Sequence, residues 1–445
     1  MRSNDQLRNW PAPSNTQSRR FFLQAAAATT LSFGARLTLA APSKRAARFV
    51  FVILRGALDG LAAVPPYADP YYGQLRGTLA IPPPGAADGA LALDGTFALH
   101  PALSFLHESY TAKELLVMHA VATPYRERSH FDGQDVLESG LTVPHAAQTG
   151  WLNRALAALP ADAAHGKELG VALGQNVPLV LRGPAPIASW APSILPAIDD
   201  DTLQRIIDRY ASDPVLGERL ADALATDRIA SDAMSESPAF AAGPDRSARG
   251  AADAGSAGGT APAPSGALAP QARGAASYLE IVRTAATFLR RPDGPCVAVF
   301  DTTGWDTHFN EGGAQGQLRT RLGILDQAMR AFRESMGESW SNTAVLLATE
   351  FGRTAAANGT RGTDHGTGAA AFLLGGAVQG GRVLADWPGL SPGALYQGRD
   401  VKPTLDLRAV ARSVLHDHLH ISTRALDGEV FADSGVPNLN GLIRA

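Results

Sequence analysis

The sequence has little cysteine, few charged residues and no long apolar run. Its one cysteine, Cys296, excludes an intramolecular disulfide and a thiolate metal cluster. Charged residues make up 18% of the 445 residues, and the formal net charge is −3. Such a balance provides no basic field to attract nucleic acid, so we expect no nucleic-acid partner. Apolar residues make up 45%, which is enough for a substantial core in one large domain or two ordinary ones.

The N-terminal segment 1–41 has the pattern of an export signal. Paired arginines at 19–20 precede a weakly apolar stretch at 25–33 and small residues at 39–41. This order is typical of a secretory signal, and arginines followed by Phe and Leu resemble the twin-arginine signal. The alternative is a chance basic pair before a short amphipathic helix. The stretch is too short for a membrane span, which needs roughly 20 apolar residues. We therefore expect the twin-arginine translocase to export the chain, with no stable membrane span.

Four apolar stretches of strand length are separated by helical patterns. Continuous apolar runs of this length are typical of parallel strands buried on both faces. The alternation predicts an α/β fold with a mostly parallel, doubly wound sheet between helices. Residues 169–181 predict a strand pair, and residues 404–419 predict a final packed helix. The four stretches are 48–54, 114–121, 295–300 and 343–348.

Two segments differ from this pattern. Residues 65–100 are rich in Pro and Gly and predict a long surface excursion. Residues 229–275 consist mainly of Ala, Gly, Ser and Pro, and so cannot bury enough apolar surface to offset their ordering entropy. We expect a mobile insertion there. It either separates two lobes or forms one loop within a single domain at 42–445, and we favour the loop.

A polar cluster follows each of the four strands. In a doubly wound parallel sheet, the carboxyl ends of the strands lie at one edge, so we expect the clusters to meet there. Carboxylates and imidazoles gathered at one place repel one another unless a cation neutralises them. Mixed ligation without Cys suits Zn or Mn, with Mg or Ca possible where carboxylates dominate. The predicted metal ligands are Asp59, Asp306, His308, Glu350, Asp364 and His365, and Ser129 with His130 forms the remaining cluster.

Several of these residues also have a purely structural interpretation. Asp59 could cap the short helical segment that follows it. Ser129 could cap a helix, or it could sit where a helix N-terminus binds an anion, beside Arg126 and Arg128. Arg353 could hold a substrate oxygen or pair with Glu350. The imidazoles of His416, His418 and His420 could bind a metal, but a position near a helix C-terminus explains them better.

The motifs around these residues resemble a known family. They look like twin-arginine-exported bacterial proteins catalogued as a domain of unknown function, which are similar to the alkaline phosphatase and sulfatase superfamily. The resemblance extends from about Phe49 to the C-terminus, without the insertion, and implies an α/β/α sandwich and a periplasmic location. The motifs are Arg-Gly-x-x-Asp-Gly at 55–60, Arg-Ser-His-Phe at 128–131, Gly-Trp-Asp-Thr-His at 304–308, Thr-Glu-Phe-Gly-Arg-Thr at 349–354 and Gly-Thr-Asp-His-Gly at 362–366.

This resemblance implies a metal-dependent hydrolase of a small anionic ester. Asp59 matches the first-strand metal ligand of the superfamily, and Ser129 falls where its nucleophile sits. Ser129 lacks the following Pro and Arg of sulfatases, which favours phosphate esters over sulfate esters. Glu350 stands where the superfamily usually has an Asp-His pair. The alternative is therefore a non-catalytic periplasmic binding or assembly protein that keeps the fold. In the hydrolase, His130 and Arg353 would join Ser129 in catalysis, while Arg126 and Arg128 would bind the substrate.

Overall fold

The computed structural model describes residues 46–161, 163, 166–192, 200–210, 213–235, 270–432 and 434–444. The predicted export signal and most of the predicted insertion lie outside these residues. Helices α7 (Pro214–Ser235) and α8 (Pro270–Arg290) run into both ends of the range 229–275, so its predicted boundaries are too wide. In the part of the chain that is described, no helix is long and apolar enough to cross a membrane.

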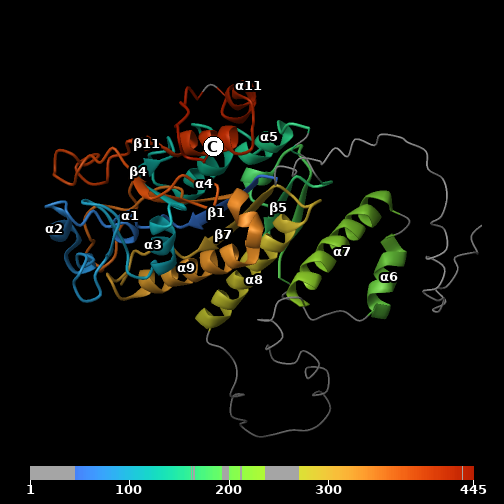
Figure 1. The fold of residues 1–445 in the computed structure, drawn as a ribbon, viewed down its shortest axis with the longest axis horizontal. Helices are drawn as coiled ribbons and strands as arrows, with labels where there is room; N and C mark the ends of the chain where they lie inside the picture. The colour runs from blue at the N-terminus through green and yellow to red at the C-terminus, as the bar shows by residue number, and fades with distance from the viewer. Residues whose placement is uncertain are drawn as a thin grey trace, which may run out of the picture. The chain divides into compact units, whose positions relative to one another are not determined.

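A large, mostly parallel sheet runs through the molecule (Figure 1). Its strands lie in the order β10-β4-β9-β8-β1-β7-β5-β6, and β11 pairs with β4. β9 is antiparallel to β4 and β8, whereas the other pairings are parallel. The predicted α/β fold with a mostly parallel sheet is confirmed. The strands are β1 (Arg48–Arg55), β4 (Leu115–Ala122), β5 (Gly170–Leu173), β6 (Ile187–Trp190), β7 (Val297–Thr303), β8 (Thr343–Ala348), β9 (Ala369–Leu374), β10 (Arg382–Leu384) and β11 (Leu405–Asp406).

Helices cover both faces of this sheet, and β1 shows why its sequence is apolar throughout. Val50 and Val52 pack into a core with α8 and α9, while Phe49 and Phe51 pack into a second core with α5 and α10. A strand buried on both faces has no polar alternation. The covering helices are α3 (Ser104–Thr111) and α9 (Gln317–Met336) beside α8 on one face, and α4 (His130–Ser139), α5 (Trp151–Ala157), α10 (Leu407–Asp417) and α11 (Thr423–Ala425) on the other.

The predicted helices follow the spacing of their apolar residues. In α9, Leu318, Leu322 and Leu325 are buried together, as their spacing of three and four residues along a helix requires. The helix predicted at 404–419 is α10, which begins where the Asp406 side chain accepts a hydrogen bond from the Arg408 backbone N–H. The remaining elements are α6 (Asp200–Tyr210), the 3₁₀ turns η2 (Leu179–Leu181) and η4 (Gly337–Asn342), and the π-helical turn η5 (Leu426–Val430).

The strand pair predicted at 169–181 is wrong. Only β5 forms there, and it pairs in parallel with β6 rather than with the residues that follow it directly. Pro178 is the reason, because it has no N–H to donate to a neighbouring strand. Its extended backbone, with φ −65° and ψ 153°, leads into the turn η2 instead.

The surface excursion predicted at 65–100 is only partly right. This stretch folds back against the sheet, and Tyr72, Arg76 and Leu99 are fully or almost fully buried. The buried arginine is accommodated because two acidic side chains of the main fold contact its guanidinium group. The short elements of the stretch are α2 (Tyr72–Arg76), η1 (Gly77–Leu79), β2 (Leu91–Ala92) and β3 (Ala98–Leu99), and α1 (Gly60–Ala63) precedes it.

The strand directions determine where the functional loops meet. The parallel strands β1, β7 and β8 end at one edge of the sheet, and β4 has the same direction. Because β9 is antiparallel, the loop between β8 and β9 leaves and re-enters the sheet at that same edge. The expected convergence of the four polar loops therefore follows from the observed pairing.

Candidate functional site

Three imidazoles and one carboxylate meet at this edge; we call His130, Asp306, His308 and His365 the His–Asp cluster. The Nε2 atom of His365 lies 3.0 Å from Nε2 of His130 and 2.9 Å from Nε2 of His308. Asp306 Oδ1 lies 3.0 Å from His308 Nε2 and 3.2 Å from His365 Nε2. Its Oδ2 atom lies 3.5 Å from His130 Nε2. The loops after β4, β7 and β8 thus deliver four possible ligands to one small space.

The other nitrogen of each imidazole has its own acceptor. Because an acceptor beside Nδ1 keeps the proton on that atom, Nε2 is left with its lone pair. Three lone pairs and a carboxylate therefore face a common centre, an arrangement that a cation stabilises. The acceptors are Glu350 Oε1 for His130 at 2.7 Å, Asp364 Oδ1 for His308 at 3.2 Å, and the Arg128 carbonyl oxygen for His365 at 3.0 Å.

Glu350 is buried behind the cluster and does not face its centre. Burial favours a higher pKa for its carboxyl group, but hydrogen bonds from His130, Gly56 and Gln134 hold the pKa below its usual value. The same contact with Glu350 raises the pKa of His130. Burial and the neighbouring charge of His130 lower the pKa of His365. Glu350 therefore orients His130 as an outer partner, and its predicted role as a direct metal ligand is not supported by this geometry.

Arg353 fixes the carboxylate of the cluster. Its Nη1 atom donates to Asp306 Oδ1 at 2.5 Å, and its Nε and Nη2 atoms donate to the side chain and carbonyl of Thr363 at 3.0 and 2.6 Å. Although burial acts in the opposite direction, these Arg353 contacts lower the pKa of Asp306. Arg353 itself is buried. One interpretation of the sequence was that Arg353 pairs with Glu350. In the structure it pairs with Asp306 instead.

Asp59 lies behind the site in a buried ion-pair network. One carboxylate oxygen accepts hydrogen bonds from the Leu61 and Ala62 backbone N–H groups, and the other pairs with Arg76. The predicted helix cap is confirmed, and both oxygens are occupied by the protein. Asp59 follows its strand as expected and its charge pairs with Arg76, while its role as a metal ligand stays a prediction.

The network continues through Glu311, which the sequence did not single out. Glu311 Oε1 lies 3.4 Å from Arg76, and its Oε2 atom accepts hydrogen bonds from the Thr307 and Thr363 hydroxyls. Burial, followed by the charge of Asp59, raises the pKa of Glu311 to about 8. Thr363 also contacts Arg353, so the network extends from Asp59 to the partner of Asp306. Neither Arg76 nor Glu311 follows a strand directly, so the strand-end pattern could not find them.

Ser129 stands at the N-cap position of α4, directly before His130. Its backbone N–H donates to the Tyr125 hydroxyl at 3.1 Å, and its side chain makes no capping hydrogen bond. The helix-cap interpretation of its hydroxyl is therefore wrong. The hydroxyl lies at the start of α4, and in the sequence Ser129 directly precedes His130 of the cluster.

The two arginines predicted to bind substrate have protein partners. Arg126 donates to the backbone carbonyls of Thr123 and Tyr125. Arg128 pairs with Asp400 at 2.8 Å and donates to Gln397 at 2.7 Å. Their side chains fix the loop before α4, and the Arg128 carbonyl orients His365. Both residues thus position the loop in this structure, and their binding of substrate stays a prediction.

Gln134 is a further site residue that the sequence analysis missed. Its Nε2 atom donates to Glu350 Oε1 at 3.2 Å, and its Oε1 atom accepts from Arg55 Nη1 at 3.0 Å. Gln134 follows His130 by four residues, and positions four apart share one face of a helix. Helical spacing could therefore have linked it to the site. The aromatic ring of Phe351 also supports His130, with stacked rings 4.9 Å apart.

Comparison with known proteins places the chain in a family. Neither the curated proteins nor the solved structures contain a significant match. Residues 107–430, well over half of the chain, match the family described as Protein of unknown function (DUF1501). The matched region contains all four residues of the His–Asp cluster. The chain is therefore a member of the DUF1501 family.

Proposed function

We propose that this protein is an exported, metal-dependent hydrolase of phosphate esters, with sulfate esters less favoured. The observation that carries the proposal is the donor set of the His–Asp cluster. The ligand atoms of His130, Asp306 and His365 lie within 4.8 Å of one another, and His308 Nε2 contacts two of these residues. Their side chains are about one quarter to two fifths exposed, so a substrate can reach them.

The ligand types favour zinc. Imidazole nitrogens suit zinc, whereas magnesium and calcium prefer oxygen ligands, and manganese is intermediate. The outer contacts of the cluster match the general pattern in which each metal-binding imidazole donates its other N–H to an acceptor. A divalent cation supplies Lewis-acid polarisation of a phosphoryl oxygen and favours attack at neutral pH. Three imidazoles and one carboxylate thus support zinc first and manganese second among the expected metals.

The residues of the chain would divide the reaction between them. Glu350 and Asp364 hold His130 and His308 in place through their Nδ1 atoms, and Arg353 holds Asp306. Ser129 Oγ would attack phosphorus, and the leaving alcohol would depart with the proton that the serine loses. Water would then cleave the phosphoserine, releasing phosphate and restoring the hydroxyl. The N-terminus of α4 favours the negative charge that Ser129 would carry.

The fold adds support for the likeness to the alkaline phosphatase and sulfatase superfamily. A mostly parallel sheet carries the cluster at the carboxyl ends of its strands, which is where open α/β sheets bind ligands. Export by the twin-arginine translocase to the periplasm remains part of the proposal. Replacing both Arg19 and Arg20 by lysine tests it: the chain should then stay in the cytoplasm, and continued export would contradict this route.

A non-catalytic periplasmic binding or assembly protein is the second candidate. Asp59 favours it, because its pairing with Arg76 leaves one cluster rather than the two-metal clamp of phosphoryl transfer. In that case the cluster would bind a metal for structure, or as part of a docking site, without turnover.

Metal analysis combined with activity assays tests the first candidate. We expect near-stoichiometric zinc in the purified chain, loss of zinc in Asp306→Asn and His365→Ala, and hydrolysis of generic phosphate esters only with the metal bound. His416→Ala is the matched control, since His416 lies on α10 and pairs with Asp417 instead. A purified chain without near-stoichiometric metal would refute the proposal. Ser129→Ala should keep the metal and lose activity at least 100-fold; unchanged activity would place the nucleophile elsewhere.

A further inference from the structure

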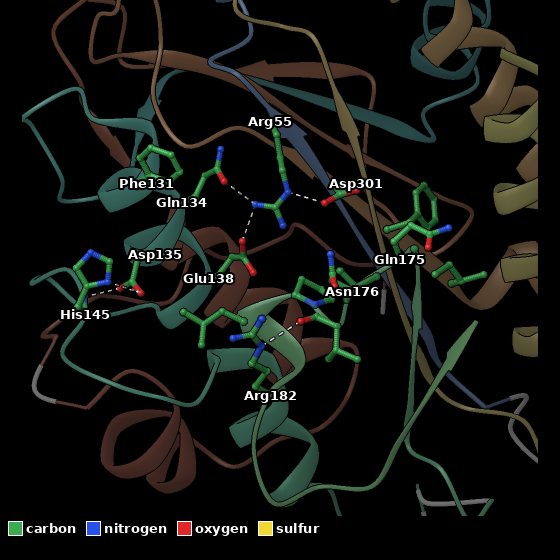
Figure 2. A pocket seen from close by; sticks show the side chains of 17 residues that line it. Arg55, Phe131, Gln134, Asp135, Glu138, His145, Gln175, Asn176, Arg182 and Asp301 are labelled. Carbon is green, nitrogen blue, oxygen red and sulfur yellow. Dashed lines mark hydrogen bonds and ion pairs between the residues drawn. The ribbon is translucent and has the colours of Figure 1, made fainter. Parts of the chain in front are cut away.

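A cavity of about 620 Å³ lies along α4, the helix that begins at His130 of the His–Asp cluster. Its walls come from α4, from the ends of β1 and β7, and from the segment that follows β5. Figure 2 shows Arg55, Gln134 and Glu138 meeting in this cavity, with Asp301 reaching Arg55. The volume falls within the range of about 300–1,000 Å³ that is usual for small-molecule sites.

Helix α4 joins the cavity to the cluster. His130 faces the cluster, whereas Phe131, Gln134 and Glu138 line the cavity at spacings of three and four residues. Gln134 links the cavity to the outer partner of His130, because it donates to Glu350 and accepts from Arg55. The cavity and the cluster are therefore built on the same helix, α4.

The acidic side chains of the cavity wall already have basic partners. Glu138 and Asp301 both pair with Arg55, and Asp135 lies 3.4 Å from the His145 imidazole. These pairs leave no carboxylate of the cavity wall without a basic neighbour. A cationic group would therefore find no free carboxylate there, whereas the guanidinium of Arg182, whose Nε atom donates to the Val177 carbonyl oxygen, offers further N–H donors to hydroxyl oxygens.

The remaining wall offers groups that suit hydroxyls and an apolar ring face. Phe131 is 84% exposed and offers an apolar ring face to the cavity. Within the described residues, the side-chain amides of Gln175 and Asn176 have no hydrogen-bond partner. Figure 2 shows Phe131 on one side of the cavity and these amides on the other. Amides both donate and accept hydrogen bonds, as hydroxyl groups do.

We propose that this cavity binds the alcohol part of the ester, and that this part is a sugar or a similar neutral polyol. This inference rests on the proposed hydrolase function, because the phosphate of the ester would react at the cluster. Binding of the sugar part in the cavity requires neither metal nor turnover. The C–H face of a sugar ring would lie against Phe131, and its hydroxyls would meet Gln175, Asn176 and the guanidinium of Arg182. The phosphate would remain at the His–Asp cluster.

Binding of methyl glycosides to the full chain tests this proposal directly. Methyl glucoside, galactoside and mannoside carry no phosphate, and saturation-transfer NMR measures their binding. We expect at least one to bind, with at least tenfold weaker binding in Phe131→Ala and in Asn176→Ala. Tyr71→Ala is the matched control, since Tyr71 is also an exposed aromatic residue but lies outside the cavity. Failure of all three to bind, or equal binding in Phe131→Ala, would overturn the proposal.

A second assay separates this inference from the proposed function. The ratio of kcat/KM for glucose 6-phosphate to that for methyl phosphate measures what the sugar part contributes. We expect this ratio to fall at least tenfold in Phe131→Ala and to stay constant in Tyr71→Ala. Hydrolysis of methyl phosphate without glycoside binding would refute only the cavity. Glycoside binding without any ester hydrolysis would refute only the hydrolase, and the cavity would stand as a sugar-binding site.

Discussion

Replacing Asp59 by asparagine should destabilise the protein without removing the metal proposed for the His–Asp cluster. Asn keeps an oxygen that can accept from the Leu61 and Ala62 N–H groups, so the helix cap is preserved. The substitution removes the charge that pairs with Arg76, and both side chains are almost fully buried. Breaking one partner of a buried ion pair costs about 3–5 kcal/mol. Because Glu311 still contacts Arg76 at 3.4 Å, we expect the lower end of that range, about 3 kcal/mol.

The same variant should change how stability depends on pH. The folded pKa of Glu311 is about 8, above its ordinary value, so its stabilising contribution is complete at low pH and is lost as pH rises toward 8. Part of that elevation comes from the Asp59 charge. Without that charge the pKa of Glu311 should fall, and the loss of stability between about pH 5 and 8 should become smaller.

Urea unfolding at several pH values and metal analysis of the folded variant measure both effects. The matched comparison is Asp306→Asn, which changes the same group inside the cluster and should lose the metal. Loss of metal from a folded Asp59→Asn protein would refute the assignment of Asp59 to the buried network. An unfolding free energy within about 0.5 kcal/mol of the original would refute the magnitude, since such values are typical of surface substitutions.

Three further changes test other parts of the structure. Glu350→Gln should weaken metal affinity about 10–100-fold, because His130 loses a charged acceptor at 2.7 Å; equilibrium dialysis measures it, and unchanged affinity would contradict the outer role of Glu350. His418 is buried with its pKa lowered to about 4, so its stabilising effect is lost as pH falls from about 6.5 toward 4. His418→Gln should remove about one proton from the acid dependence of unfolding, and an unaltered slope would argue against it. Phe51→Ala should cost about 3–5 kcal/mol in urea unfolding, because its ring packs edge-on against Trp151; a cost below 1 kcal/mol would contradict this packing.

The sheet could be predicted because the sequences of its central strands have a distinctive apolar pattern. Continuous apolar runs of this length, such as 48–54 and 343–348, are typical of strands that are buried on both faces. The convergence of their loops then follows from parallel pairing, and it brings His130, Asp306 and His365 together as expected. The prediction of a strand pair at 169–181 failed for a local reason. Pro178 leads into a turn where the second strand was expected.

The roles of individual charged residues could not be read from strand order alone. Asp59 and Asp306 both follow strands, yet one is buried against Arg76 and the other faces the His–Asp cluster. The difference comes from Arg76, which belongs to a stretch that looks like a surface loop in the sequence. A buried partner from a distant segment leaves no periodic signal in the sequence. Only the folded structure therefore distinguishes Asp59, which pairs with Arg76, from Asp306, which faces the cluster.

The wide spacing of the cluster along the chain has a consequence for folding. His130 and His365 are 235 residues apart, and His308 precedes His365 by 57 residues. Contacts between such distant positions form only after the intervening chain has closed its loops, which is entropically costly and slow. The metal ion proposed for the cluster would therefore not nucleate this fold, as a metal does in a short zinc-binding module. Acquisition of the metal should instead be a late event that reports a completed sheet, and a kinetic trace of metal uptake should lag behind burial of the tryptophans.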